Sequence, residues 1–185
     1  MHNHYFIGIK APASIEEIVK QYREKYRLSN NYKAIPHLDD LHITLLFIGA
    51  LPEQQVEPLQ ESLAALADKH SDFHLIVDGL SFFGSPKGPR VVYLSVEQSN
   101  ELDALQQSVA MIGADQLGIE PDKRFTPHIA IAKKRKINGE FPIQKESCTP
   151  HPFHVDGFSL FRIHPSKTPK YEAVQTITLK NPLNK

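Results

Sequence analysis

The segment 41–49 reads LHITLLFIG, and a second segment, 125–132, reads FTPHIAIA. Each places a histidine, His42 or His128, at the head of an apolar and β-branched run that has the length of a β-strand. Because side chains alternate between the two faces of a strand, each histidine shares a face with the residue two positions further on. A slip of one residue would bury both histidines, so the pattern fixes the register. The two segments therefore predict two strands that each present an imidazole from a defined face.

Two imidazoles in one chain suit a reaction that needs both a proton acceptor and a proton donor. The unperturbed pKa of histidine lies near neutrality, so one ring can accept a proton while the other donates one. In-line displacement at phosphorus uses this division, because one group activates the attacking oxygen and the other protonates the departing oxygen. The two histidines are 128 − 42 = 86 residues apart in a chain of 185 residues, which is consistent with two similar halves. The alternative is two ordinary strand histidines that are satisfied by hydrogen bonds.

Four motifs resemble, in the same order, those of the two-histidine (2H) phosphoesterases, specifically the branch of 2′-5′ RNA ligases and RNA 2′,3′-cyclic phosphodiesterases. They read HITLLFIG at 42–49, PRVVY at 89–93, RFTPHI at 124–129 and YEAV at 171–174. The resemblance covers most of the chain. It implies that His42 and His128 are the catalytic acid and base and that the hydroxyl of Thr44 holds a phosphate oxygen. It also implies that the histidine strands line a cleft between two lobes.

The second motif departs from the family pattern at Ala130, where relatives carry threonine or serine. In the family that hydroxyl helps to hold the phosphate, and the loss of one preorganised donor typically costs on the order of a hundredfold in rate. Relatives commonly have a basic residue five positions after the second histidine, and Lys133 stands there. Strict alternation points Lys133 away from His128, so Lys133 reaches the site only if the strand bulges or ends.

Arg90 and three aromatic residues are further candidates for substrate contacts. Arg90 stands at the mouth of a predicted strand, where a guanidinium could meet a phosphate, or it is a solvated loop residue. Phe47, Phe125 and Tyr93 could stack on a base, and packing in the core is the alternative for each.

Two polar segments flank the histidine strands. Residues 36–40 precede the first strand and could carry ligand contacts, with a solvated turn as the alternative. The run Lys133-Lys134-Arg135-Lys136 follows the second strand directly. Such a basic cluster could gather ligands that carry phosphate, with a gain that falls as salt rises. Its alternative is a solvated hairpin turn that leads into Asn138-Gly139.

Periodicity and turn residues predict an α+β chain. The predicted strands are 5–9, 41–49, 73–83, 91–96, 125–132, 155–163 and 171–179; the predicted helices are 14–27, capped by Ser14, 52–69, and one from Ser99 to Gly113 or Gly118; residues 141–152 are predicted as loop. This order indicates an α+β fold with two antiparallel sheets, helices on their outer faces and approximate twofold symmetry. We expect residues 1–185 to form a single two-lobed 2H phosphoesterase-like domain.

The composition limits the partners of this chain. Lysine plus arginine and aspartate plus glutamate number 21 each, so the formal net charge is zero, which argues against a large footprint on a long nucleic acid. The motifs contain no Walker-type loop, dinucleotide fingerprint or metal constellation, so we expect no cofactor and no metal. The one cysteine, Cys148, indicates a reducing compartment. With neither an export signal nor an apolar run of membrane-spanning length, we expect a cytoplasmic monomer that does not bind membranes.

The resemblance implies metal-independent opening of a 2′,3′-cyclic phosphate, on an RNA 3′ end or a cyclic nucleotide, to a 2′-phosphomonoester. Reverse 2′-5′ ligation is left open, as is which histidine is the acid and which the base. Ala130 favours an alternative, a module that binds a nucleotide or RNA end with weak or lost catalysis. A third interpretation is a phosphoesterase that acts on a cyclic phosphate outside RNA, which the neutral net charge mildly favours.

Overall fold

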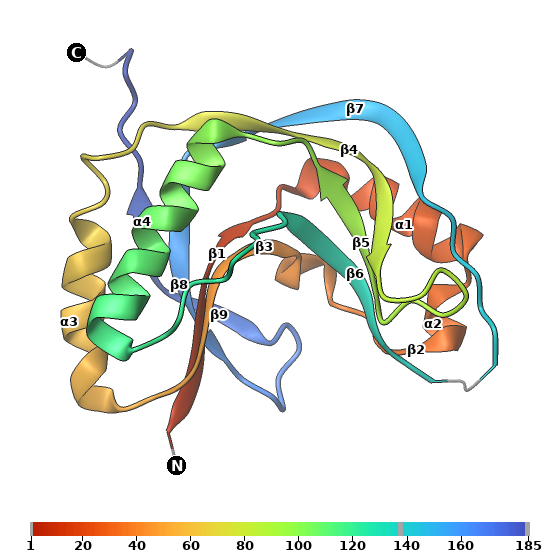
Figure 1. Cartoon of the computed structure of the whole chain (residues 1–185), viewed down its shortest axis with the longest axis horizontal. Coiled ribbons are helices and arrows are strands. Elements are labelled where there is room, and N and C mark those ends of the chain that lie inside the picture. The colour runs from red at the N-terminus through yellow and green to blue at the C-terminus, as the bar shows by residue number, and fades with distance from the viewer. Residues whose placement is uncertain (1, 137–138, 184–185) are drawn as a thin grey trace.

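The computed structural model describes residues 2–136 and 139–183. The protein is built around one antiparallel sheet in which the order of the strands differs from their order in the chain (Figure 1). The strands are β1 (Asn3–Lys10), β2 (Tyr32–Ala34), β3 (His42–Leu51), β4 (Phe73–Phe83), β5 (Val91–Val96), β6 (His128–Arg135), β7 (Glu146–Val155), β8 (Gly157–Ile163) and β9 (Tyr171–Thr178). They pair in the order β7-β4-β5-β6-β3-β1-β8-β9, and β2, which lies outside this order, pairs with β6. Every pairing between these strands is antiparallel.

The sheet has two halves that meet at one residue pair. Strands β7, β4, β5 and β6 form one half, strands β3, β1, β8 and β9 form the other, and β3 pairs with β6 through Ile43 and Ile129. Both isoleucines are fully buried, so this junction lies in the core. The α+β class and the two-lobed antiparallel arrangement are as predicted, and the two expected sheets are continuous at this junction.

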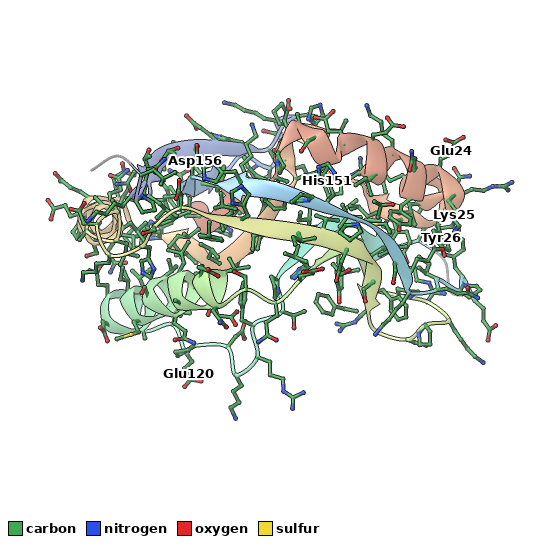
Figure 2. The ribbon with its side chains drawn as sticks, turned by 90° about the horizontal axis from the view of Figure 1, so that it is seen from above. Glu24, Lys25, Tyr26, Glu120, His151 and Asp156 are labelled. Atoms are coloured by element: carbon green, nitrogen blue, oxygen red, sulfur yellow. The ribbon has the colours of Figure 1, made fainter. Side chains whose placement is uncertain are left out.

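The helices pack against the two halves in two groups. They are α1 (Glu16–Lys25), α2 (Leu28–Asn31), α3 (Glu53–Ala64) and α4 (Asn100–Leu117), with 3-10 turns at Ala13–Ile15 and Leu38–Asp40. Helix α1 joins the first half, where Arg23 donates a hydrogen bond to the carbonyl of Ile131. Helix α4 joins the second half, where Gln106 donates to the carbonyl of Leu45. Figure 2 shows α1 and α4 on opposite sides of the molecule. No helix within the described residues is both long and apolar enough to cross a membrane.

A bulge in β6 decides where Lys133 points. Ala130 pairs with Tyr93 of β5 and Ala132 pairs with Val92, so Ile131 is an extra residue on β6. Ile131 and Ala132 are both buried in succession, which breaks the alternation. Lys133 therefore returns to the face that carries His128 and Ala130. This is the bulge that Lys133 requires in order to reach the site.

Two predicted elements were wrong in detail. The segment 141–152, predicted as loop, contains the start of β7, which includes Pro150 and Pro152. Proline is tolerated there because β7 is the terminal strand of the sheet. The predicted helix 14–27 begins as a 3-10 turn, and its α-helical part ends at Lys25, shortly before Arg27 takes a left-handed conformation. Ser14 makes no helix cap but bonds to His151. The Asn138-Gly139 turn includes a residue outside the described part of the chain.

Candidate active site

His42 and His128 lie on neighbouring strands at the junction of the two halves. The Ile43–Ile129 pair has the offset 129 − 43 = 86, which equals the offset 128 − 42 = 86 between the histidines. The antiparallel register therefore places His42 opposite Ala130 and Thr44 opposite His128. A local twofold axis through the isoleucine pair relates the two motifs. As predicted, these side chains share the less buried face, while the isoleucines face the core.

Each imidazole is oriented by a carbonyl group two residues before it. The Nδ1 atom of His42 lies 2.7 Å from the carbonyl oxygen of Asp40, and the Nδ1 atom of His128 lies 2.7 Å from that of Thr126. A carbonyl oxygen can only accept, so Nδ1 of each ring carries the proton and donates it. Both rings thereby keep Nε2 for proton transfer, which is the tautomer that an acid–base pair needs.

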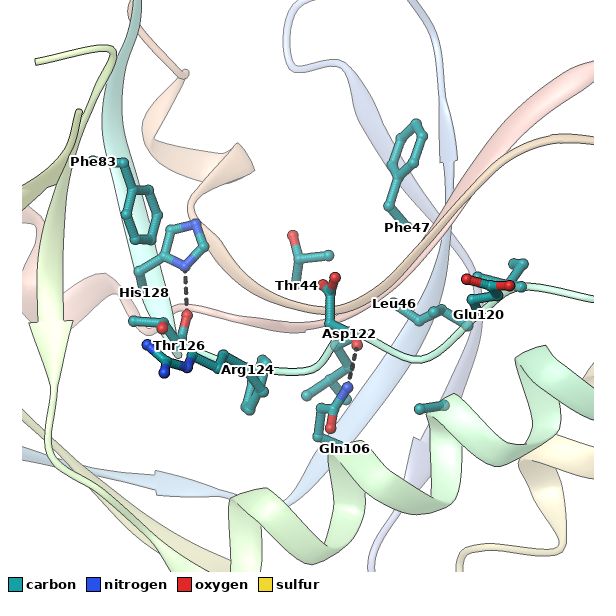
Figure 3. A pocket seen from close by; sticks show the side chains of 14 residues that line it. Thr44, Leu46, Phe47, Phe83, Gln106, Glu120, Asp122, Arg124, Thr126 and His128 are labelled. Atoms are coloured by element: carbon teal, nitrogen blue, oxygen red, sulfur yellow. Dashed lines mark hydrogen bonds between the residues drawn. The ribbon is translucent and has the colours of Figure 1, made fainter.

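The two halves of the site differ in one hydroxyl group. Nε2 of His42 lies 3.0 Å from Oγ1 of Thr44. The twofold counterpart of Thr44 is Ala130, which offers His128 no such partner. Within the described residues, Nε2 of His128 has no hydrogen bond, and Figure 3 shows this ring beside the pocket that Thr44 also lines. The departure seen in the sequence thus falls at the position that would complete the symmetric site.

Burial and positive charge keep both imidazoles neutral at pH 7. Burial lowers the pKa of His42 to about 4, the hydrogen bond to Asp40 partly opposes this, and the charges of Lys133 and His128 lower it further. The pKa of His128 is also lowered, mainly by burial, with Lys133 acting in the same direction. Lys133 therefore acts on both rings. An anionic phosphate between them would oppose this effect and favour protonation of one ring.

Aromatic side chains pack around each imidazole. The ring of His42 lies 4.5 Å from that of Phe6 and 5.2 Å from that of Tyr171, between centroids. The ring of His128 lies 4.9 Å from that of Phe83 and 5.1 Å from that of Tyr93. Tyr93 is only 6% exposed, so of the two alternatives for this residue the structure favours core packing over base stacking.

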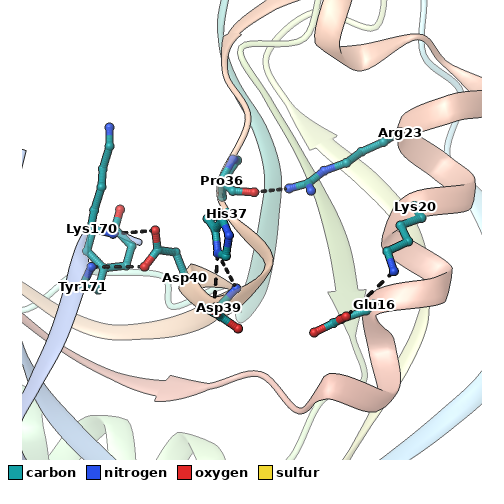
Figure 4. A network of polar contacts seen from close by, with 9 residues as sticks. All are labelled: Glu16, Lys20, Arg23, Pro36, His37, Asp39, Asp40, Lys170 and Tyr171. Atoms are coloured by element: carbon teal, nitrogen blue, oxygen red, sulfur yellow. Dashed lines mark hydrogen bonds and ion pairs between the residues drawn. The ribbon is translucent and has the colours of Figure 1, made fainter. Parts of the chain in front are cut away.

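Asp40 is a site residue that sequence reasoning missed. Its segment was given a solvated turn as one alternative, yet its side chain is buried. The carboxylate accepts hydrogen bonds from the backbone N–H groups of Lys170 at 2.8 Å and Tyr171 at 3.1 Å (Figure 4). Asp40 thus orients His42 through its carbonyl group and fixes Tyr171, which contacts the same imidazole, through its carboxylate. No local pattern reveals this contact, because its partners are 130 residues away in sequence.

A cavity of about 430 Å³ lies beside Thr44 and His128. Its wall includes Phe125, which is partly buried and packs against the core, and Phe47, whose side chain is 61% exposed. Stacking on a base stays a prediction for both residues. The loop after α4 adds Glu120, Asp122 and Arg124 to the wall (Figure 3). Sequence reasoning did not select the two carboxylates, because nothing in their spacing marks them.

Arg90 is exposed on the turn between β4 and β5, where its backbone N–H group donates a hydrogen bond to the carbonyl group of Phe83. Its side chain lines neither this cavity nor another cavity, which is lined by Asp40, Lys133 and Tyr171. A role in phosphate binding stays a prediction for Arg90. Within the described residues no group of three or more histidine, cysteine, aspartate or glutamate side chains is arranged to hold a metal ion.

Comparison with known proteins identifies the family. The model of the 2'-5' RNA ligase superfamily matches residues 11–167. A Bacillus subtilis protein named RNA 2',3'-cyclic phosphodiesterase is 32% identical over 179 residues, which are 92% of this chain and 93% of that protein. A Geobacillus stearothermophilus protein of the same name is 34% identical over 96% of this chain, which spans only 57% of that relative's length.

Solved structures show the same fold. The protein TT0787 of Thermus thermophilus has a TM-score of 0.83 at 23% identity and covers 97% of this chain and 99% of its own. Escherichia coli LigT, crystallised with 3'-AMP, has a TM-score of 0.82 at 20% identity and covers 98% of this chain and 100% of its own. By its sequence match and its fold, the chain belongs to the 2'-5' RNA ligase superfamily.

Proposed function

We propose that this protein is an RNA 2′,3′-cyclic phosphodiesterase in which His42 and His128 are the general acid and base. The observation that carries the proposal is the pair of imidazoles on adjacent strands, each with Nδ1 held by a carbonyl group and Nε2 left for chemistry. The names of the Bacillus subtilis and Geobacillus stearothermophilus relatives support the reaction.

The reaction needs two proton transfers on opposite sides of one phosphorus atom. One neutral imidazole accepts a proton at Nε2 from water as the water oxygen attacks phosphorus. The bond from phosphorus to the 3′ oxygen breaks, and the other ring, as an imidazolium, gives its Nε2 proton to that oxygen. The product is a 2′-phosphomonoester with a free 3′ hydroxyl. In this proposal Thr44 and Lys133 stabilise the non-bridging oxygens, which gain charge in the transition state.

The two lobes are proposed to act as one domain. The hydrophobic core is continuous across both halves of the sheet, and each half supplies one histidine. Separation of the lobes would divide the acid from the base, so the proposed chemistry requires them to stay together.

Product analysis tests the proposed reaction. We expect adenosine 2′,3′-cyclic phosphate and an RNA oligonucleotide with a cyclic end to yield 2′-phosphates, at a rate that EDTA leaves unchanged because the imidazoles supply both proton transfers. A 3′-phosphate product, or a rate that EDTA abolishes, contradicts the proposal. Binding of these ligands with no product after long incubation selects the alternative that Ala130 favours, a binding module.

The pH dependence of kcat/KM gives a further expectation, because it reports the pKa values of the free enzyme. The reactive form has one neutral ring and one protonated ring, and both pKa values are lowered. The rate therefore falls as pH rises through the usual titration range of histidine. Lys133→Gln removes a charge that lowers both pKa values, so the whole profile should move to higher pH.

Lys136→Gln is the matched control for this shift. Lys136 belongs to the same basic run, but it is exposed and donates to the carbonyl of Ser29. Its replacement should leave the profile in place. If Lys133→Gln lowers kcat/KM but leaves its pH profile in place, Lys133 contacts the substrate and does not set the pKa values of the two histidines.

A further inference from the structure

A second cavity, of about 570 Å³, is lined by Asp40 and Tyr171, which both contact His42, and it shares no lining residue with the first. It is referred to below as the lysine pocket. Its charged lining consists of Lys33, Lys133, Lys134, Lys170 and Asp40, with His37 at its wall. The lysines come from three separate parts of the chain: β2, β6 and the segment before β9. The fold therefore gathers four ammonium groups that the sequence keeps apart.

The positive charge of the lysine pocket is not balanced by its own acidic residue. The carboxylate of Asp40 already accepts the backbone N–H groups of Lys170 and Tyr171. Among the described residues, no carboxylate forms an ion pair with any of the four lysines. Burial is the main cause that lowers the pKa of Lys133, and the like charges of Lys134 and Lys170 lower it further. Such crowding is relieved by a bound anion.

The backbone at the lysine pocket is also unusual. Lys134 has a φ of 58°, which lies in the left-handed region that residues other than glycine rarely adopt. Strain of this kind costs stability and is concentrated at binding and active sites. It follows directly after the bulge that turns Lys133 toward the histidines. The β6 segment 131–134 therefore has two irregularities, and both lie where lysines face ligand space.

Two residues that line the lysine pocket, Tyr171 and Lys133, connect it to the proposed site of reaction. Tyr171 lines the pocket, and its ring is 5.2 Å from that of His42. Lys133 lines the pocket and acts on both imidazoles. Along β3, the residues of the first cavity follow His42, whereas Asp40 of the lysine pocket precedes it. His128 lines the first cavity, and His42 contacts Tyr171 of the lysine pocket, so both cavities adjoin the residues that are proposed to hold the phosphorus atom.

The two cavities differ in the chemistry that they suit. The first contains exposed aromatic surface at Phe47 and two carboxylates, those of Glu120 and Asp122, against one cation, Arg124. Aromatic rings stack on bases, and carboxylates accept hydrogen bonds from the amino groups of bases but repel phosphate. The lysine pocket has the opposite character. A nucleic acid end thus fits with its terminal base in the first cavity and its next phosphate among the lysines.

We infer that the lysine pocket binds a second phosphate group of the substrate, the one on the 5′ oxygen of the nucleoside whose cyclic phosphate reacts. This inference rests on the proposed function and deepens it. The pocket makes the enzyme selective for an RNA end, in which that phosphate continues the chain, over a cyclic mononucleotide that lacks it.

Three substrates separate the contributions of the second phosphate and the second base. They are adenosine 2′,3′-cyclic phosphate, the same compound with a 5′-phosphate, and the dinucleotide ApA with a 2′,3′-cyclic end. We expect kcat/KM to rise by roughly tenfold to a hundredfold from the first to each of the others, the range for hydrogen bonds to a charged group. The gain should shrink as salt rises, since it is electrostatic.

A triple variant, Lys33→Gln, Lys134→Gln and Lys170→Gln, tests the lysine pocket itself. Lys133 is left intact because it acts on the histidines. The variant should lose the preference for a second phosphate and keep its parental kcat/KM on adenosine 2′,3′-cyclic phosphate within about twofold, which also shows that it is folded. The matched control, Lys20→Gln, Lys69→Gln and Lys180→Gln, removes the same charge from exposed positions elsewhere and should keep the preference.

The outcomes distinguish this inference from the proposed function. If the parental protein opens none of the three substrates, the proposed function fails. If it opens all three with equal kcat/KM, or if the preference survives in the triple variant, the inference alone is overturned. If kcat/KM rises for the compound with a 5′-phosphate but not for the dinucleotide, the pocket binds a terminal phosphate, and its role in binding a chain is overturned. A gain in the dinucleotide alone would assign the preference to the second base and overturn the inference as well.

Discussion

Replacement of either His42 or His128 by alanine is expected to lower kcat for opening of a 2′,3′-cyclic nucleotide by roughly 10²- to 10⁴-fold, the usual contribution of general acid–base catalysis. Each ring has Nδ1 committed to a carbonyl group, so proton transfer at Nε2 is the function that alanine removes. Because both transfers belong to one displacement at phosphorus, the double variant should lose little more than the more damaged single variant. Single-turnover measurements with adenosine 2′,3′-cyclic phosphate would show this.

His74→Ala is the control for these variants. His74 is an exposed histidine in β4 that packs against His154, and it lines neither the cavity at His128 nor the lysine pocket. Its replacement should leave kcat unchanged. Near-parental turnover in either His42→Ala or His128→Ala would refute the two-imidazole mechanism. Losses that multiply in the double variant would show that the rings act in separate steps.

The features that the sequence predicted well depend on short-range rules. Strand alternation placed His42 with Thr44 and the isoleucines in the core, because a strand has a period of two whatever it pairs with. The bounds of β4 and β5 are those predicted, 73–83 and 91–96. Ser99 caps α4, and Gly118, at a φ of 66°, ends it. Each of these signals is complete within a few neighbouring residues.

The features that escaped prediction depend on contacts between distant segments. The buried carboxylate of Asp40 is explained by backbone N–H groups at Lys170 and Tyr171, which only the folded sheet brings near. The bulge at Ile131 is set by pairing with β5, so alternation along β6 alone pointed Lys133 the wrong way. The lysine pocket combines residues of β2, β6 and the segment before β9. Its local positive charge could not be predicted from the composition, because the net charge of the chain is zero.

Replacement of Ala130 by threonine is expected to raise kcat by about tenfold or more, because a preorganised donor at a developing oxyanion contributes a factor of this size or larger. The local twofold axis makes Ala130 the counterpart of Thr44, whose Oγ1 lies 3.0 Å from Nε2 of His42. A hydroxyl at position 130 would stand in the same relation to His128 and aim at the same phosphate. A β-branched residue also suits the strand conformation of β6.

Ala130→Val separates the hydroxyl group from the shape of the side chain. Valine matches threonine in volume and branching but donates no hydrogen bond, so the rate should rise in Ala130→Thr and not in Ala130→Val. Thr44→Val, which removes the hydroxyl that the site already has, should lower kcat on the order of a hundredfold. Equal rates in Ala130→Thr and the parental protein would mean that another donor already serves this side of the phosphate. Lys133, which the bulge turns to the same face, is the group placed to do so.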